Sequence, residues 1–549
     1  MLHQQGVEAG DVVVIYMPVI PEALIAMLAC ARIGATHCVV FGGFAANELA
    51  TRLRDTSPKA ILTASCGFEA KRVIPYKETL REAIHLAAWQ GPTLVYQRKQ
   101  VPAMLGVDDI DWEEAEREAP PCPPLAVPST HPLYILHTSG TTGAPKGIVR
   151  DTGGYMTALL WSMRNIYGCG PGDVFWAASD VGWVVGHSYM TYGPLLKGCT
   201  TVLYEGKPVG TPDNASFWRV IERHRVNVLF CAPTALRAIR KADPAGLALR
   251  HPSGGQWLYQ YNINSLRAVF LAGERCDSPT ANWAEELLGR PVLDHWWQTE
   301  AGWSITAATP AEASAGVIPP GAAGRAMPGW DVQCVDDDGQ PLQAGSSGNI
   351  VCGVPLPPGA MTTIWNAHDR YVSSYFTRFD RWYDTGDAGF IDPNGYVHVM
   401  GRTDDVINVA GHRLSTGAIE EVVAKLDKVA ECAVVGMAHP IKGQVPIAFV
   451  VLRDDAQCLP ADAESEAIKA VRDNLGAIAT MQAAFVVDKL PKTRSGKILR
   501  RTLLQMVDGI PASIPATIED ASVVSEIERV VKARGVQGES IDADRGEHR

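Results

Sequence analysis

The sequence predicts an α/β protein of more than one domain, and three observations support this prediction. Apolar strand-like segments alternate with amphipathic helical segments from the N-terminus onward, as in parallel sheets that carry helices on both faces. The chain has 549 residues, which exceeds what one hydrophobic core usually organises. Apolar residues make up 46% and charged residues 20% of the chain, a composition typical of globular proteins.

The alternation can be followed element by element. We expect a strand over 11–17 and then a helix over 21–34, where Pro21 occupies the first turn. Further expected elements are a strand over 36–41, a helix over 46–55, a strand over 59–65, a proline-rich linker over 119–132, a strand over 226–233, a helix over 234–242, a strand over 266–274 and a strand that begins at 291.

The pattern of expected elements changes in the last third of the chain. No internal repeat is visible in the sequence. From Gly321 short strands separated by glycines are expected, and Asp392–Gly395 predicts a hairpin turn between two apolar strands. Beyond Asp404 a smaller α+β unit is expected, with a helix over 419–426 and strands over 432–439 and 446–454. The resulting division is 1–403, 404–510 and a polar, loosely held tail over 511–549.

The stretch YILHTSGTTGAPKGIVR over 134–150 is the most informative one. Its hydroxyl side chains, closely approachable glycine backbone and single lysine suit the binding of phosphate. A Walker A motif is excluded by the spacing around the lysine. The alternative is an ordinary Ser/Thr/Gly turn between strands. The predicted phosphate-binding residues are Thr138, Ser139, Gly140, Thr141, Thr142, Gly143 and Lys146.

Composition also argues against several classes of function. The formal charge of −11 disfavours nonspecific nucleic-acid binding. The twelve cysteines contain no C-x-x-C pair and no zinc-ligand spacing. No segment reads as a membrane span or a secretory signal. We therefore expect an intracellular, soluble protein of the cytoplasm or the mitochondrial matrix, of unknown oligomeric state.

Five motifs, in order along the chain, resemble those of the adenylate-forming enzymes, which include acyl-CoA synthetases, luciferases and peptide-synthetase adenylation domains. The motifs are the loop over 134–150, WWQTEAGW over 296–303, YDTGDAG over 383–389, GRTDDVINVAGHR over 401–413 and PKTRSGKILRR over 491–501. FLAGERCDS over 270–278 and VRDTGGY over 149–155 resemble the short-chain acyl-CoA synthetase branch, most of all its propionyl-CoA synthetases, with acetyl-CoA synthetases close by.

The resemblance implies a fold, a reaction and a set of residues. It implies a large multi-subdomain N-terminal domain of the adenylate-forming type over 1–403 and a smaller mobile C-terminal domain. The usual N-terminal segment of the large domain is expected to be lacking, which would leave the first sheet with an open edge. The reaction joins a short-chain acid to ATP with Mg²⁺ and then to coenzyme A. The resemblance implies catalytic roles for Lys497, Thr299 and Glu300, with Glu300 also binding Mg²⁺, and a hinge at Asp404. The implied ribose and phosphate contacts are Asp387, Arg402 and Arg413, and the implied coenzyme A contacts are Arg72, Gly411 and Arg472. The implied cofactor or adenine contacts are Gly273, Glu274, Arg275, Asp294, His295, Trp296, Trp297 and Gln298.

The resemblance also implies an acyl pocket lined by Val184, Val185, Ala272 and Trp297. Acetate enzymes usually carry valine where this chain has Ala272. Two missing methyls leave room for about one more carbon, a preference of a few-fold to tenfold for propionate at ~0.8 kcal/mol per buried CH₂. The alternatives are an acetate enzyme, a module that loads a carrier protein, and an inactive nucleotide-binding homologue.

Overall fold

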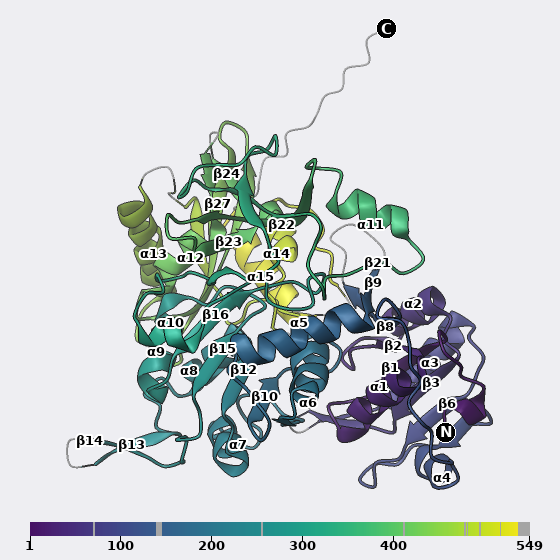
Figure 1. The fold of residues 1–549 in the computed structure, drawn as a ribbon. Coiled ribbons are helices and arrows are strands. Elements are labelled where there is room, and N and C mark those ends of the chain that lie inside the picture. The colour runs from purple at the N-terminus through teal and green to yellow at the C-terminus, as the bar shows by residue number, and fades with distance from the viewer. Residues whose placement is uncertain are drawn as a thin grey trace.

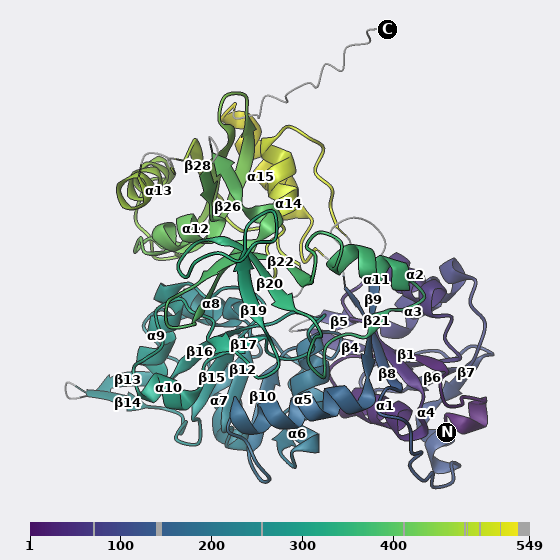
Figure 2. The ribbon, with the colours of Figure 1, turned by 45° about the horizontal axis from the view of Figure 1, so that its top comes forward.

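The computed structural model describes residues 1–69, 72–138, 145–253, 256–409, 412–476, 479, 481–493, 496–515 and 518–535. Two large sheets stand beside each other in the body of the molecule (Figure 1), and a smaller unit lies above them, seen well separated in Figure 2. We call the part from Ile407 to Ala533 the C-terminal unit and the part before it the large unit.

The first sheet has the strand order β21-β9-β8-β2-β1-β3-β6-β7 among the described residues. The pairs from β8 through β2, β1, β3 and β6 to β7 are parallel, whereas β9 is antiparallel to both of its neighbours, β8 and β21. Its elements are η1 (His3–Gln5), β1 (Val12–Tyr16), α1 (Pro21–Ile33), β2 (Thr36–Val39), α2 (Ala46–Thr56), β3 (Ala60–Ala64), α3 (Tyr76–Ala87), β6 (Thr93–Tyr96), β7 (Asp109–Asp111), α4 (Trp112–Arg117), β8 (Pro132–Thr138), β9 (Lys146–Asp151), α5 (Thr152–Asn165) and β21 (Thr363–Ile364), with the small hairpin β4 (Gly67–Glu69) and β5 (Arg72–Ile74) beside it.

The second sheet has the order β11-β10-β12-β15-β16-β17-β18, again for the described part of the chain. Its five strands from β11 to β16 are parallel, so their carboxyl ends meet at one edge. Its elements are β10 (Val174–Ala178), η2 (Gly186–Tyr192), α6 (Gly193–Leu196), β11 (Thr200–Thr201), α7 (Ser216–His224), β12 (Val228–Cys231), α8 (Pro233–Ala242), β15 (Ala268–Leu271), α9 (Ser278–Leu288), β16 (Val292–Trp296), β17 (Thr306–Ala307), α10 (Pro310–Ser314) and β18 (Arg325–Ala326).

A third, antiparallel sheet connects the body to the C-terminal unit. Its order is β19-β20-β22-β23, and the expected turn at Asp392–Gly395 joins β22 to β23. Its elements are β19 (Val332–Val335), β20 (Gly348–Gly353), α11 (His368–Tyr375), β22 (Trp382–Ile391), β23 (Val397–Arg402) and the 3₁₀ turn η3 (Thr403–Asp405). The predicted hinge position, Asp404, lies in η3; its side chain is outside the described part.

The C-terminal unit is an α+β sandwich, as expected. Its sheet has the order β25-β24-β27-β26, with β28 added parallel to β27. Its elements are β24 (Ile407–Val409), β25 (His412–Leu414), α12 (Thr416–Ala424), β26 (Val429–His439), β27 (Gly443–Leu452), α13 (Pro460–Leu475), β28 (Ala483–Val486), α14 (Arg500–Val507) and α15 (Ser522–Ala533).

The expectation of a polar, loosely held tail from residue 511 is wrong for part of that range. Helix α15 packs against the sheet of the C-terminal unit, because Val523, Val524, Ile527 and Val531 form one apolar face. These four side chains are buried in the same hydrophobic cluster as Phe449 and Phe485. The average polarity of the tail hid this helical spacing.

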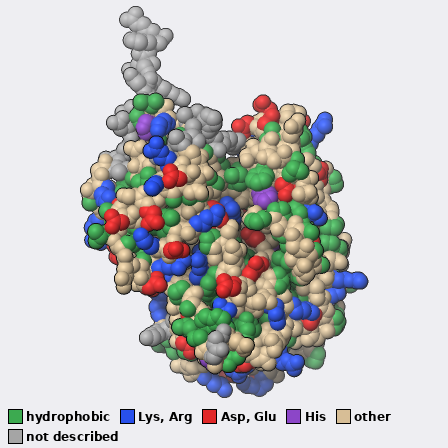
Figure 3. Space-filling model, turned by 90° about the vertical axis from the view of Figure 1, so that its left-hand side faces the viewer, with side chains coloured by type: hydrophobic (Ala, Val, Ile, Leu, Met, Phe, Trp, Pro, Cys, Tyr) green, Lys and Arg blue, Asp and Glu red, His purple; other side chains and the backbone are tan. Residues whose placement is uncertain are grey.

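One side of the molecule carries a two-stranded hairpin, β13 (Arg250–Ser253) and β14 (Gln256–Tyr259), which projects from the body in Figure 1. Acidic and basic side chains are interspersed on that side (Figure 3). Within the described residues, no helix combines the length and the apolar character needed to cross a bilayer.

The packing of α15 can be tested by truncating Ile527, one of its two most deeply buried aliphatic side chains. Ile527 is 1% exposed, so Ile527→Ala leaves a cavity and lowers the free energy of unfolding of the C-terminal unit by about 2–5 kcal/mol. Urea denaturation followed by circular dichroism measures this loss. The neighbouring exposed Glu526 provides the control, since Glu526→Ala should stay within about 0.5 kcal/mol. Equal stabilities of the two variants would show that α15 does not stabilise the unit.

Candidate active site

The carboxylate of Asp387, on β22, is the centre of a buried polar group. Its Oδ2 accepts hydrogen bonds from the indole Nε1 of Trp296 at 2.9 Å and from Nε2 of Gln298 at 2.6 Å. Arg402, at the end of β23, reaches its Oδ1 at 3.4 Å. Burial raises the pKa of Asp387, and the charge of Arg402 opposes that rise. The structure therefore brings together four of the predicted nucleotide-binding residues.

A second polar group lies around Glu300, directly after Gln298 and Thr299. The hydroxyl of Tyr375 donates to Oε1 of Glu300 at 2.8 Å. The Nζ of Lys146 lies 3.4 Å from the same hydroxyl and 4.5 Å from the Tyr375 ring centroid. Burial lowers the pKa of Lys146, while the nearby Glu300 raises it. The lysine of the phosphate-binding stretch thus faces the carboxylate predicted to hold Mg²⁺.

The site can hold one Mg²⁺ ion only if a phosphate ligand supplies further oxygen ligands beside the protein's own. In the part of the chain that the structure describes, no three acidic, histidine or cysteine side chains gather as a metal site. Magnesium in nucleotide enzymes is commonly held by one or two carboxylates together with phosphate oxygens and waters. A single carboxylate, that of Glu300, beside a phosphate-binding lysine matches this pattern.

Lys497, the predicted catalytic lysine, lies in the C-terminal unit. Its charge is a minor influence that opposes the rise in the pKa of Asp387 caused by burial. The turn that carries it is closed by hydrogen bonds between Thr493 and Lys497. The same turn packs on α8 of the large unit, where a Cβ on Gly496 would lie 2.8 Å from Oγ1 of Thr234. The turn with the predicted catalytic lysine therefore lies against α8 of the large unit.

Gly273, one of the residues predicted to frame the adenine, has free space beside its backbone. This glycine follows β15 with φ +102°, and a Cβ built there would meet nothing within 4 Å. Only glycine adopts this backbone conformation readily. The position combines a special backbone with free space beside it, as a cradle for a ligand requires.

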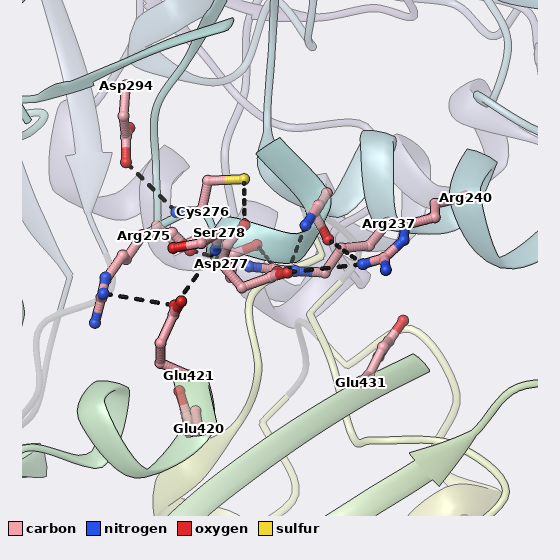
Figure 4. A network of polar contacts seen from close by, with 12 residues as sticks. Arg237, Arg240, Arg275, Cys276, Asp277, Ser278, Asp294, Glu420, Glu421 and Glu431 are labelled. Atoms are coloured by element: carbon pink, nitrogen blue, oxygen red, sulfur yellow. Dashed lines mark hydrogen bonds and ion pairs between the residues drawn. The ribbon is translucent and has the colours of Figure 1, made fainter. Parts of the chain in front are cut away.

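The two residues after Gly273 are engaged in ion pairs (Figure 4). Glu274 pairs with the half-buried Arg237 of α8 at 2.5 Å. Arg275 pairs with Glu421 of α12 at 3.5 Å, and Glu421 also accepts from the backbone N–H of Ser278 at 3.3 Å. In this arrangement the Arg275 side chain joins the large unit to the C-terminal unit.

Of two other predicted adenine neighbours, His295 points into the core, and the half-buried Asp294 accepts from the backbone N–H of Cys276 at 3.4 Å. His295 is 2% exposed and is held between the Tyr167 hydroxyl at 2.9 Å and the Leu271 carbonyl at 2.5 Å. Burial lowers the pKa of His295 to about 4 and raises the pKa of Asp294 to about 7. The His295 ring is thus a structural contact, and only its backbone remains for a ligand.

The predicted acyl-pocket residues share one hydrophobic cluster. Ala272 and Trp297 are buried within it, and Val184 and Val185 pack against it. The ring of Trp297 lies 5.4 Å from that of Tyr189 and 6.2 Å from that of Phe230.

Several predicted residues lie outside the described part of the chain. They are Ser139, Gly140, Thr141, Thr142, Gly143 and Gly411, together with the side chains of Asp404 and Arg413. Thr138 is the last residue of β8, and its backbone pairs with Lys146 across the two strands that flank this loop.

The two arginines predicted to meet coenzyme A are not brought together. Arg72 lies on β5, where its exposed side chain pairs with Glu69 at 2.6 Å. Arg472 is exposed on α13. These two elements lie far apart in Figure 2. Because Glu69 also pairs with Lys207 at 2.8 Å, Arg72 belongs to a mixed-charge cluster in this arrangement.

Sequence reasoning missed Tyr375 and Arg150. Both contact residues of the candidate site, but the motifs implied no role for either of them. Tyr375 lies on α11, in a segment without a recognisable motif. Arg150 ends the stretch 134–150, where a cation directly after the apolar residues Ile148 and Val149 is a sign of a buried polar contact.

Comparisons with known proteins agree with this architecture. Residues 1–365 match the AMP-binding enzyme family, and residues 418–497 match the AMP-binding enzyme C-terminal domain. A rat protein, acyl-CoA synthetase short-chain family member 3, mitochondrial, is 51% identical over 538 residues, covering 97% of this chain and 77% of its own length. A propionate–CoA ligase of Salmonella typhimurium is 42% identical over 543 residues, covering 97% and 84%.

A solved structure supports the fold in the same way. Acetoacetyl-CoA synthetase from Streptomyces lividans superposes with a TM-score of 0.82 at 25% identity, covering 97% of this chain and 79% of that one. The family match spans more than half of the chain, and the relatives align along nearly all of it. The chain therefore belongs to the AMP-binding enzyme family.

Proposed function

We propose that this protein is an AMP-forming acid–thiol ligase that converts a short-chain carboxylate, with propionate preferred, to its coenzyme A thioester. The observation that carries the proposal is the pair of neighbouring polar groups around Asp387 and Glu300. Asp387 accepts from Trp296 and Gln298, and Glu300 accepts from the Tyr375 hydroxyl, which lies 3.4 Å from Nζ of Lys146. The names of the relatives support the choice of substrate class.

In the first half-reaction a carboxylate oxygen attacks the α-phosphorus of ATP, and pyrophosphate leaves with the electrons of the broken P–O bond. Both partners are anions, so catalysis depends on fixed positive charge at the reacting atoms. Lys146 contacts the outer phosphates, Thr299 donates to the α-phosphate, and Lys497 bridges the carboxylate and the α-phosphate. Mg²⁺, held by Glu300, supplies further charge neutralisation when bound.

Nucleotide recognition rests on the group around Asp387. The two carboxylate oxygens accept from the ribose 2′- and 3′-hydroxyls, while Trp296, Gln298 and Arg402 hold the carboxylate in place. The adenine lies along the open backbone at Gly273.

In the second half-reaction the C-terminal unit turns about η3, and the thiol of coenzyme A attacks the acyl carbon. A C–S bond forms, the C–O bond to AMP breaks, and the thiol loses its proton. Arg72, Gly411 and Arg472 are the proposed contacts for coenzyme A. They act after the rotation, which explains why Arg72 and Arg472 lie apart in the present arrangement.

The proposed function is tested by measuring AMP and pyrophosphate formation by the purified full chain. With ATP and Mg²⁺, pyrophosphate release should depend on added propionate, and AMP release should speed up when coenzyme A is also present. ATP binding without acid-dependent pyrophosphate release would identify an inactive nucleotide-binding homologue instead. A preference for acetate across a graded series of acids would identify an acetate enzyme.

Lys497→Ala tests the lysine proposed to act in catalysis. Because it removes a cation that acts at the developing charge, it should lower ATP–pyrophosphate exchange by roughly 10²–10³-fold. ATP binding, measured by calorimetry, should change little. Lys489 is exposed on the same part of the C-terminal unit, and Lys489→Ala should keep the wild-type exchange rate. Full-rate exchange by Lys497→Ala would remove the proposed role.

Ala272→Val tests the pocket argument. Ala272 is 5% exposed beside Gly273, so two added methyls should shorten the pocket and shift the propionate-to-acetate ratio of kcat/KM by a few-fold to tenfold toward acetate. Ala268, at the other end of β15 and 1% exposed, provides a matched control. Ala268→Val should affect stability without altering the ratio. An unchanged ratio for Ala272→Val would mean that this position does not set chain length.

The cellular compartment stays a prediction, cytoplasm or mitochondrial matrix, as does the absence of nucleic-acid partners. Fractionation of cells that express the full chain separates the two compartments.

A further inference from the structure

Arg150 is a cation in the core of the large unit. It lies on β9 and is 0% exposed. Its Nε donates to the Tyr134 hydroxyl at 3.2 Å, and its guanidinium lies 5.8 Å and 5.7 Å from the ring centroids of Tyr134 and Tyr155. A charge held so deep requires strong hydrogen-bond partners, because its desolvation is costly.

Those partners are backbone carbonyls of the candidate site. Nη1 donates to the carbonyl of Glu300 at 3.0 Å, and Nη2 donates to the carbonyl of Thr299. Nη1 also donates to the carbonyl of Gly359 at 2.5 Å. One planar guanidinium therefore grips two successive peptide groups of the 299–300 segment and ties them to a distant loop. Charged donors make hydrogen bonds of roughly twice the ordinary strength.

The same segment is held from other sides. The backbone N–H of Met361 donates to the Glu300 carbonyl at 2.8 Å. Ser188 Oγ donates to the Gly302 carbonyl at 2.7 Å and lies 2.6 Å from the Tyr155 hydroxyl. Gly302 has φ +77°, and a Cβ there would lie 2.7 Å from Cζ of Arg150. The absence of that Cβ allows the guanidinium to reach the two carbonyls.

From this geometry we propose that Arg150 is a positioning residue of the reaction, which acts by fixing the backbone that presents Thr299 and Glu300. The inference rests on the proposed function, in which Thr299 and Glu300 act at the α-phosphate and at Mg²⁺. Arg150 itself contacts neither the α-phosphate nor Mg²⁺ in this proposal, because its nitrogen atoms donate to backbone carbonyls and to the Tyr134 hydroxyl. A displacement of about 1 Å at such groups can cost roughly 10²-fold in rate.

The experiment compares Arg150→Met with Arg150→Lys in the full chain. Met keeps an unbranched apolar stem but removes the guanidinium and every donor, so acid-dependent ATP–pyrophosphate exchange should fall roughly 10²-fold. Lys keeps the charge but lacks the planar fork, so it should restore part of the rate. The KM for propionate should be unchanged. If the Met variant does not fold, the Lys variant carries the test alone.

Two further readouts separate positioning from general stability. Calorimetric titration of ATP with and without Mg²⁺ should show that Arg150→Met, like Glu300→Gln, reduces the gain in ATP affinity that Mg²⁺ provides. In a double-mutant cycle, Arg150→Met combined with Glu300→Gln should lower exchange far less than the product of the two single effects.

The control is Arg52→Met, which removes another deeply buried arginine. Arg52 is 3% exposed on α2 and pairs with Glu48 at 2.7 Å. It should lower the melting temperature as Arg150→Met does, while exchange and the effect of Mg²⁺ stay as in the wild type. Normal exchange by Arg150→Met, or fully multiplicative effects in the cycle, would overturn the inference. Absence of acid-dependent exchange in the wild type would instead overturn the proposed function.

Discussion

The buried carboxylate of Asp387 is the constraint on which the site depends. An unpaired charge in an interior costs several kcal/mol, so this position requires donors from neighbouring elements. They come from the end of β16, from the segment that follows it and from β23. These contacts hold the second sheet and the antiparallel sheet, both parts of the large unit, in one geometry.

Local patterns predicted much of this arrangement. Strand and helix periods gave the parallel sheets, and the rule that ligands lie at strand carboxyl ends pointed to Gly273 and Gln298, which follow the neighbouring strands β15 and β16. Partners that are distant in sequence could not be predicted. Tyr375 meets Glu300 only because α11 packs beside β22, and Arg275 meets Glu421 only because the C-terminal unit docks there. The helix α15 was within reach, since its apolar spacing is local.

The ion pairs between the two units are weak enough to break and to re-form with other partners. Arg275 and Glu421 pair at 3.5 Å with side chains 30% and 13% exposed, and Lys207 and Glu519 pair at 3.1 Å with both ends exposed. Ion pairs near the surface contribute about 0–1 kcal/mol each. Such contacts hold an orientation without fixing it, which suits a rotation about the short turn η3. The pair between Arg237 and Glu274 lies wholly within the large unit and need not break.

This division separates the site into a fixed part and an exchangeable part. Arg150, Glu300 and Tyr375 belong to the large unit, and the hydrogen bonds among them and their segment cross no boundary between the units. The residues proposed to hold phosphate and metal can therefore keep one geometry through the proposed two half-reactions. Lys497 lies on the other side of the turn at η3, so the proposed rotation of the C-terminal unit would move this lysine away from them. The rigid backbone grip and the weak contacts between units are thus complementary requirements of a two-step reaction.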